Sequence, residues 1–155
     1  MKNSFAKRLL KWNNEENHRQ MPWKGEKNPY YIWLSEIILQ QTRVEQGLPY
    51  FLKFKEKYPT VKKLAEAKED EVMKLWQGLG YYSRARNLKK KKKNIQQNYK
   101  GKFPNIFEEL KKLKGIGDYT AAAIASFAFG EKRAVVDGNV IRVLARIFGI
   151  ETAFD

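Results

Sequence analysis

Two acidic residues stand in surroundings that suit acid–base chemistry, and the first of them is Asp137. It lies between an apolar run and a Gly-Asn pair, directly before a segment whose apolar residues follow helical spacing. A helix N-cap belongs at this place, so the carboxylate should point out of a helix start. The local pattern by itself is that of an ordinary cap, and a catalytic role needs support from elsewhere in the chain.

The second acid, Glu36, lies within a strongly apolar segment. A helix is predicted from about Pro29 or Tyr30 to Val44, and apolar residues surround nearly its whole axis, which is typical of a buried helix. No cation lies three or four residues from Glu36. Burial should therefore raise the pKa of its carboxyl, which suits a group that gives up and later accepts a proton near neutrality. A glutamate on the one solvated edge of this helix is the alternative.

The sequence Gly115-Ile116-Gly117 separates two segments with helical patterns, at 105–112 and 120–129. The spacing predicts a tight helix-hairpin-helix turn, because glycines tolerate positive φ and let the backbone approach a ligand closely. The main-chain N–H groups of such a turn can bind a phosphate without reading the base sequence.

A glycine-rich loop, Gly78 to Tyr82, precedes a strongly basic segment. It carries Leu79 and Tyr81, and seven cations follow from Arg84 to Lys93 without an acid. Apolar and aromatic side chains on a tight turn beside a basic helix are suited to wedging into a DNA duplex. The lysines at 89–93 can also be read as a solvated helix face, since five consecutive positions cannot all point one way.

Composition narrows the class of partner. The 155 residues suit one domain, or one and a fraction. The 31 Lys and Arg against 17 Asp and Glu give a net charge of +14, which predicts a polyanionic partner. Nucleic acid is favoured because aromatic residues are interleaved with the basic ones. No apolar run approaches the roughly 18 residues of a membrane span and no signal-peptide pattern opens the chain, so we expect an intracellular protein without a membrane partner.

The remaining segments predict further helices and no strands. An amphipathic helix is expected at 4–13, with Phe5, Leu9 and Trp12 on one stripe, and shorter helices are expected at 49–58, at 62–68 and from Glu69 onward. The single histidine, His18, lies in a polar stretch and is assigned no role. The predicted fold class is all-α.

Five collinear motifs resemble the helix-hairpin-helix (HhH-GPD) DNA glycosylases of base-excision repair, and most closely the adenine glycosylases that remove adenine mispaired with 8-oxoguanine. The similarity covers almost all of the chain. The motifs are Met-Pro-Trp at 21–23, Pro-Tyr-Tyr-Ile-Trp-Leu-Ser-Glu-Ile-Ile-Leu-Gln-Gln-Thr at 29–42, Gly-Leu-Gly-Tyr-Tyr-Ser-Arg-Ala-Arg-Asn-Leu at 78–88, the hairpin at 113–119, and Val-Asp-Gly-Asn-Val-Ile-Arg-Val-Leu-Ala-Arg at 136–146.

The resemblance implies a helix-hairpin-helix glycosylase core. A six-helix domain at 26–134, with the hairpin at 113–119, would bind kinked duplex DNA in a basic groove and extrude the target adenine. Residues 1–25 would be an N-terminal helix and linker belonging to a second helical domain. Residues 135–155 would hold the catalytic aspartate loop and the start of the returning helices.

The family's catalytic roles fall on the two acids. By resemblance, Asp137 stabilises the positive sugar that develops as the N-glycosidic bond breaks, and Glu36 protonates the adenine ring. This division agrees with a desolvated glutamic acid and an ionised, capping aspartate. Tyr119 falls where the lyase members of the superfamily carry a Schiff-base lysine, and a phenol cannot form an imine. The resemblance therefore favours a monofunctional glycosylase that leaves an abasic site.

The resemblance also implies binding residues. Lys24 replaces an expected arginine, which keeps the charge but not a bidentate contact. The base pocket would be formed by Trp23, Lys24, Tyr119 and Asn139. The DNA contacts would come from Gln40, Gln41, Thr42, Leu79, Tyr81, Arg84, Arg86, Gly115 and Gly117. A cation could also lie in the hairpin on the carbonyls of Lys111, Leu113 and Ile116.

The chain departs from the family pattern in one respect. Family members normally continue with a four-cysteine [4Fe-4S] motif and a further domain that checks for 8-oxoguanine, whereas this chain has no cysteine and stops at Asp155. No cofactor is therefore expected in this chain, which we expect to be truncated after the catalytic core. The predicted partner is duplex DNA with an A:8-oxoguanine or A:G mispair, bound by a cytoplasmic, nucleoid-associated monomer. The alternatives are a non-catalytic DNA-binding fragment and an endonuclease III-like glycosylase.

Overall fold

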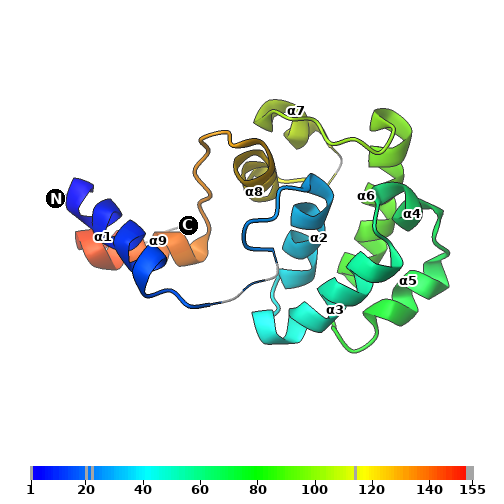
Figure 1. The fold of residues 1–155 in the computed structure, drawn as a ribbon, viewed down its shortest axis with the longest axis horizontal. Coiled ribbons are helices and arrows are strands. Elements are labelled where there is room, and N and C mark those ends of the chain that lie inside the picture. The colour runs from blue at the N-terminus through cyan, green and yellow to red at the C-terminus, as the bar shows by residue number, and fades with distance from the viewer. Residues whose placement is uncertain (1, 20, 22, 114, 153–155) are drawn as a thin grey trace.

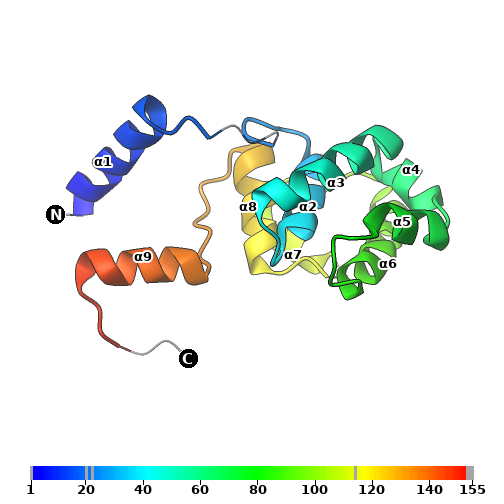
Figure 2. The same ribbon diagram turned by 90° about the horizontal axis from the view of Figure 1, so that it is seen from below.

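The structure is a computed structural model that describes residues 2–19, 21, 23–113 and 115–152, with the side chains of residues 2, 3, 89–94 and 98 left aside. Every regular element among these residues is a helix, so the prediction of an all-α fold is confirmed (Figures 1 and 2). The helices are α1 (Lys2–Glu15), α2 (Pro29–Leu39), α3 (Val44–Lys57), α4 (Val61–Glu66), α5 (Glu69–Trp76), α6 (Ser83–Tyr99), α7 (Phe107–Lys112), α8 (Asp118–Phe129) and α9 (Gly138–Phe148).

Helix α2 lies at the centre of the molecule, between α8 on one side and α3 and α6 on the other (Figure 1). Its start is fixed locally, because the Asn28 side chain accepts a hydrogen bond from the Tyr30 N–H at 3.0 Å and proline occupies the first helical position. Trp33, Leu34 and Ile38 are completely buried. The buried helix expected from the apolar pattern is thus confirmed, and it carries Glu36 in its last turns.

The predicted end of this helix at Val44 is wrong. The helix stops at Leu39, because Gln41 adopts a φ of 54° that an α-helix cannot continue, and α3 begins at Val44. Pro49 consequently lies inside α3 and not at its start as predicted. The turn between α2 and α3 leaves Gln40 and Gln41 exposed beside the end of α2.

The other predicted boundaries move by smaller amounts. Helix α4 spans 61–66 where 62–68 was predicted, and α7 and α8 begin at Phe107 and Asp118, two residues away from their predicted starts. The predicted N-cap of α4 and the predicted C-cap of α8 are confirmed. The Thr60 side chain accepts a hydrogen bond from the Lys63 N–H at 3.2 Å, and α8 ends at Gly130 with a φ of 69°.

Helices α1 and α9 both lie at the same end of the molecule, apart from the packed helices α2–α8 (Figures 1 and 2). The Phe5 ring meets the Phe148 ring edge-on, with 6.3 Å between their centroids. Leu9 and Trp12 of the predicted apolar stripe are exposed. The division into segments 1–25, 26–134 and 135–155 stays a prediction. None of the described helices combines the length and the apolar character that crossing a membrane requires.

Candidate active site and nucleic-acid interface

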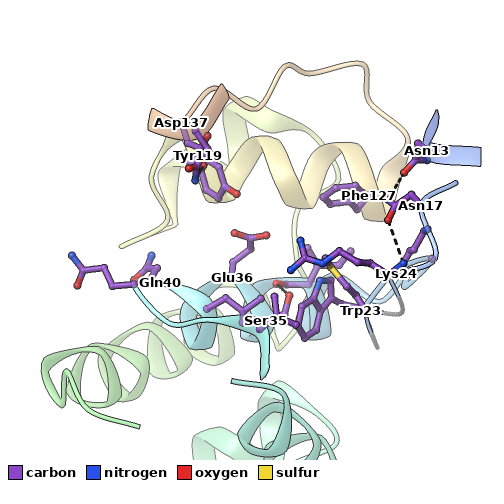
Figure 3. Close-up of a pocket in the computed structure, with 18 residues that line it drawn as sticks. Asn13, Asn17, Trp23, Lys24, Ser35, Glu36, Gln40, Tyr119, Phe127 and Asp137 are labelled. Carbon is purple, nitrogen blue, oxygen red and sulfur yellow. Dashed lines mark hydrogen bonds between the residues drawn. The ribbon is translucent and has the colours of Figure 1, made fainter. Parts of the chain in front are cut away.

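A pocket of about 760 Å³ lies between α2, α8, the segment after α1 and the residues that lead into α9. Glu36 and Asp137 both line it, although 100 residues separate them in the sequence. In Figure 3 the Glu36 carboxyl points away from α2 toward α8, and Asp137 and Tyr119 lie together on the facing wall. The fold therefore brings the two acids predicted to act together into one cavity.

Asp137 caps α9 with one of its two oxygens. Its Oδ1 accepts a hydrogen bond from the Val140 N–H at 2.8 Å, and its backbone is extended, as an N-cap requires. Its Oδ2 receives only a long contact, 3.5 Å, from the Asn139 side-chain amide. Because the cap uses only Oδ1, the capping role and a role in the pocket are compatible. Asp137 can therefore cap α9 and also act on a molecule bound in the pocket.

Glu36 has a strongly perturbed acidity. Burial raises the pKa of its carboxyl to about 7, and the negative charge of Asp137 contributes in the same direction. The expected effect of desolvation is thus confirmed, while the contribution of Asp137 could be recognised only once the two acids were known to share a cavity. A carboxyl with this pKa is half protonated at neutral pH and can act as a general acid.

The raised pKa of Glu36 has a consequence for stability. Ionisation of this carboxyl costs more free energy in the folded than in the unfolded chain, so its contribution to stability falls as pH rises from about 4.5 to about 7. We expect Glu36→Gln to raise the free energy of unfolding by roughly 1–3 kcal/mol at pH 8 and to leave it unchanged near pH 4. Urea unfolding at both pH values measures the difference. An equal effect at pH 4 and pH 8 would contradict it.

Tyr119 completes the acidic side of the cavity. It lies in the first turn of α8, its side chain is partly buried (41% exposed), and it lines the same pocket. Burial raises the pKa of its phenol, and the charges of Glu36 and Asp137 raise it further. The phenol is therefore a hydrogen-bond donor at neutral pH, and it cannot act as an amine nucleophile.

The predicted base-pocket residues all line this cavity. Trp23, Lys24, Tyr119 and Asn139 belong to it, as do Gln40 and Gln41 from the turn after α2. The position of Trp23 is fixed by an edge-on contact with the buried Phe51 ring, with 5.6 Å between centroids. The recognition role of each residue stays a prediction.

Several lining residues were missed by sequence reasoning. Asn13 and Asn17, at and after the end of α1, reach the cavity and are joined by a hydrogen bond of 2.9 Å (Figure 3). Phe127 of α8 also lines it, and this residue could have been found, because it follows Tyr119 by eight positions and so lies near the same helix face. Nothing in the sequence pattern indicated Asn13 or Asn17. The other missed lining residues include Arg19, Met21 and Ser35.

Most of the predicted DNA contacts are on the surface. Gln40, Gln41 and Arg86 are exposed, and Tyr81 is 59% exposed on a loop where its φ is 46°. Thr42 is partly buried, and its hydroxyl accepts a hydrogen bond from Arg84. The basic run Lys89–Lys93 was predicted to bind DNA or to form a solvated helix face, and its side chains lie outside the described part of the chain.

The hairpin forms at the predicted place. Gly115 and Gly117 are exposed between α7 and α8, and only Gly115 has the positive φ, 83°, that was expected of both. Gly117 has a φ of −83° and occupies the N-cap position of α8. Residue 114 lies outside the described chain.

Two of the predicted DNA contacts, Leu79 and Arg84, have buried side chains. The Leu79 side chain is 2% exposed and belongs to the hydrophobic core, so it is not available to enter a duplex. Arg84 is 7% exposed, and its guanidinium bonds to backbone carbonyls of the protein. The Leu79 prediction rested on the glycine-rich loop and on the resemblance, and the Arg84 prediction rested on the basic segment and on the resemblance. Neither kind of evidence reveals which side chains turn inward. We exclude both residues from the proposed DNA contacts.

The residues present do not fit the iron–sulfur cluster implied by the resemblance, because the chain has no cysteine to supply a thiolate ligand. Within the described ranges, no group of three His, Asp or Glu side chains could hold a metal ion. In the hairpin, the Leu113 carbonyl accepts a hydrogen bond from the Ile116 N–H at 2.9 Å. A cation on the carbonyls of Lys111, Leu113 and Ile116 stays a prediction.

Comparison with known proteins relates this site to DNA repair. Residues 34–154 match the family model described as HhH-GPD superfamily base excision DNA repair protein. The adenine DNA glycosylase of Buchnera aphidicola subsp. Baizongia pistaciae is 44% identical over 146 residues, which cover 94% of this chain and 42% of the relative. The chain thus spans less than half the length of this relative.

Solved structures show the same fold. A thermostable thymine-DNA glycosylase superimposes with a TM-score of 0.89 at 32% identity, covering 95% of this chain and 68% of the other. A non-covalent complex of endonuclease III with DNA superimposes with a TM-score of 0.78 at 25% identity, covering 96% of this chain and 69% of the other. The chain therefore belongs to the HhH-GPD superfamily of base excision DNA repair proteins.

Proposed function

We propose that this chain carries the catalytic site of a DNA glycosylase that removes adenine mispaired with 8-oxoguanine or guanine in duplex DNA. The observation that carries the proposal is the shared cavity of Glu36 and Asp137, in which burial and the second charge raise the pKa of Glu36 to about 7. The similarity to adenine DNA glycosylases supports the choice of base.

The two acids have complementary tasks in this reaction. Protonated Glu36 donates its proton to a ring nitrogen of adenine, which makes the base a neutral leaving group as the bond to the sugar breaks. The Asp137 carboxylate stabilises the positive charge that develops on the sugar. A water molecule then adds to the sugar carbon and returns a proton to Glu36. The products are free adenine and an abasic site.

Tyr119 supports a monofunctional reaction. Its phenol lines the cavity that the two acids share. By resemblance, Tyr119 stands where lyase members carry the amine that forms an imine with the sugar. Because the phenol retains its proton at neutral pH, it can donate a hydrogen bond to the flipped nucleotide. We therefore expect strand breakage only after alkali treatment of the abasic product.

The proposed DNA contacts come from the turn after α2, the loop before α6, the first turn of α6 and the hairpin. They are Gln40, Gln41, Thr42, Tyr81, Arg86, Gly115 and Gly117, with Trp23, Lys24, Tyr119 and Asn139 at the base pocket. The net charge of +14 supports binding to the phosphate backbone. We propose that the protein acts as an intracellular, nucleoid-associated monomer.

The test uses duplexes with adenine opposite 8-oxoguanine, guanine or thymine, and free adenine is measured before alkali treatment. We expect release from the first two and none from the A:T duplex. Thymine opposite guanine is included, because the structural similarity to a thymine-DNA glycosylase favours thymine as the second candidate base. Release of thymine alone would show that the substrate base is thymine and not adenine.

DNA binding without base release in any duplex would favour a non-catalytic module. Such a module should show affinity that falls with salt, with log K declining by about 0.9 per neutralised phosphate, and no preference for a mispair. A lyase product without alkali would instead favour an endonuclease III-like reaction. These outcomes separate the proposed function from both alternatives.

A further inference from the structure

The buried side chain of Arg84 holds the C-terminal end of α2. Its Nη1 donates to the carbonyl oxygen of Ile38 at 2.8 Å, to that of Ile37 at 3.3 Å, and to that of Gln40. The last carbonyls of a helix have no partner within the helix and form the negative end of its dipole. A guanidinium at this place satisfies several of them at once and compensates for the burial of its own charge.

The same guanidinium also reaches two segments, 40–42 and 78–82, that lie far apart in the sequence. Its Nη2 donates to the Thr42 hydroxyl at 3.0 Å, in the turn after α2, and approaches the Gly80 carbonyl at 3.5 Å in the loop before α6. Its carbon Cζ lies 5.3 Å from the ring centroids of Tyr81 and Trp76. One side chain therefore links segment 40–42 to segment 78–82.

Both linked segments have a backbone conformation that needs support. Three non-glycine residues of the described chain have positive φ, and two of them, Gln41 at 54° and Tyr81 at 46°, lie in these segments. Such conformations cost free energy and persist only where the surroundings hold them. Arg84 contacts the residues on each side of Gln41 and also contacts Tyr81 itself.

We propose that Arg84 is a positioning residue that fixes segments 40–42 and 78–82 relative to each other, so that Gln41 and Tyr81 meet the DNA duplex as one rigid unit. This inference rests on the proposed function only in taking these two segments as DNA contacts. The contacts of Arg84 that support the inference lie within the protein and do not involve DNA.

The geometry requires a guanidinium and not only a positive charge. Arginine presents its donors in a planar fork, whereas the lysine ammonium is a compact point charge that cannot reach both segments together. Arg84→Lys keeps the charge and removes this link. Arg86→Lys is the matched control for exchange, because Arg86 lies on the same helix, is exposed and undergoes the same change.

Hydrogen–deuterium exchange on the free protein tests the link without any activity assay. We expect Arg84→Lys to speed amide exchange about tenfold in both segments, as loss of a hydrogen bond to a charged group predicts, and to leave the α7–α8 hairpin unchanged. Arg86→Lys should leave all of these rates unchanged. A faster rate in one segment alone, or equally faster exchange throughout the protein, would overturn the proposal.

Thr42→Val provides a second test if Arg84→Lys does not fold. It removes the hydroxyl that Nη2 contacts, which also donates to the Gln40 carbonyl at 3.3 Å. We expect about threefold faster exchange in both 40–42 and 78–82, because the guanidinium links them. Acceleration confined to 40–42 would contradict the link.

Duplex affinity supplies the functional readout. We expect Arg84→Lys to weaken binding of an A:8-oxoguanine duplex about tenfold. Faster amide exchange in both segments without a change in duplex affinity would refute the positioning role. If the wild-type chain neither binds nor cleaves this duplex, the proposed function fails, while the exchange rates still decide whether Arg84 links the two segments.

Discussion

Asp137→Asn should lower the single-turnover rate of adenine release by about 10³-fold while changing the free energy of unfolding by less than about 0.5 kcal/mol. The rate falls while the stability is kept, because Asp137 acts both in the pocket and as the N-cap of α9. Asparagine caps a helix as well as aspartate does, so the hydrogen bond from the Val140 N–H can be kept. The negative charge that faces the developing positive sugar is lost, and a neutral amide cannot replace it.

The control for this variant is Asp70→Asn. Asp70 is an exposed acid in the first turn of α5, so the control removes the same charge from a helix start outside the cavity. We expect it to release adenine at the wild-type rate. Adenine release from the A:8-oxoguanine duplex and thermal unfolding are measured for both variants. If Asp137→Asn is both slow and less stable, Asp137 would have only the structural role of capping α9.

Glu36 should give the reaction a characteristic dependence on pH. With a pKa of about 7 for its carboxyl, the single-turnover rate should be level on the acidic side and fall about tenfold per pH unit above neutrality, because the general acid must be protonated. Glu36→Gln should be about 10³-fold slower and should lack this decline, since an amide has no proton to give in this range. The rate constants are measured between pH 5.5 and 9 with saturating enzyme.

The matched control is Glu45→Gln. Glu45 is exposed in the first turn of α3, and the variant should retain both the wild-type rate and the decline above neutrality. A rate that rises through pH 7 in the wild-type chain would make Glu36 a base in the rate-limiting step. The opposite slope would therefore reverse the assigned direction of proton transfer.

The parts of the structure that the sequence predicted correctly depend on local pattern. The caps at Thr60 and Asp137 follow from side-chain hydrogen bonds to the nearby backbone, and burial of α2 follows from the apolar residues around its axis. The raised pKa of Glu36 follows from the same burial. Each of these features leaves a signal within the residue's own helix, although the contribution of Asp137 to the pKa of Glu36 does not.

The features that the sequence did not reveal depend on tertiary contacts. The end of α2 at Leu39 depends on a positive φ at Gln41, which Arg84 supports from a position more than forty residues away. The burial of the Arg84 and Leu79 side chains also depends on tertiary contacts. The sequence does not show which side chains of this region turn inward. The lining by Asn13 depends on where the end of α1 lies.

If Glu36 and Asp137 interact across one cavity, the pKa of the Glu36 carboxyl must depend on the charge of Asp137. Its side-chain carboxyl carbon can be followed by NMR as a function of pH in the wild-type chain and in Asp137→Asn. We predict a pKa of about 7 in the wild type and a lower value in the variant, because the second charge is removed. A wild-type value near the ordinary 4.5, or the same value in both proteins, would contradict it.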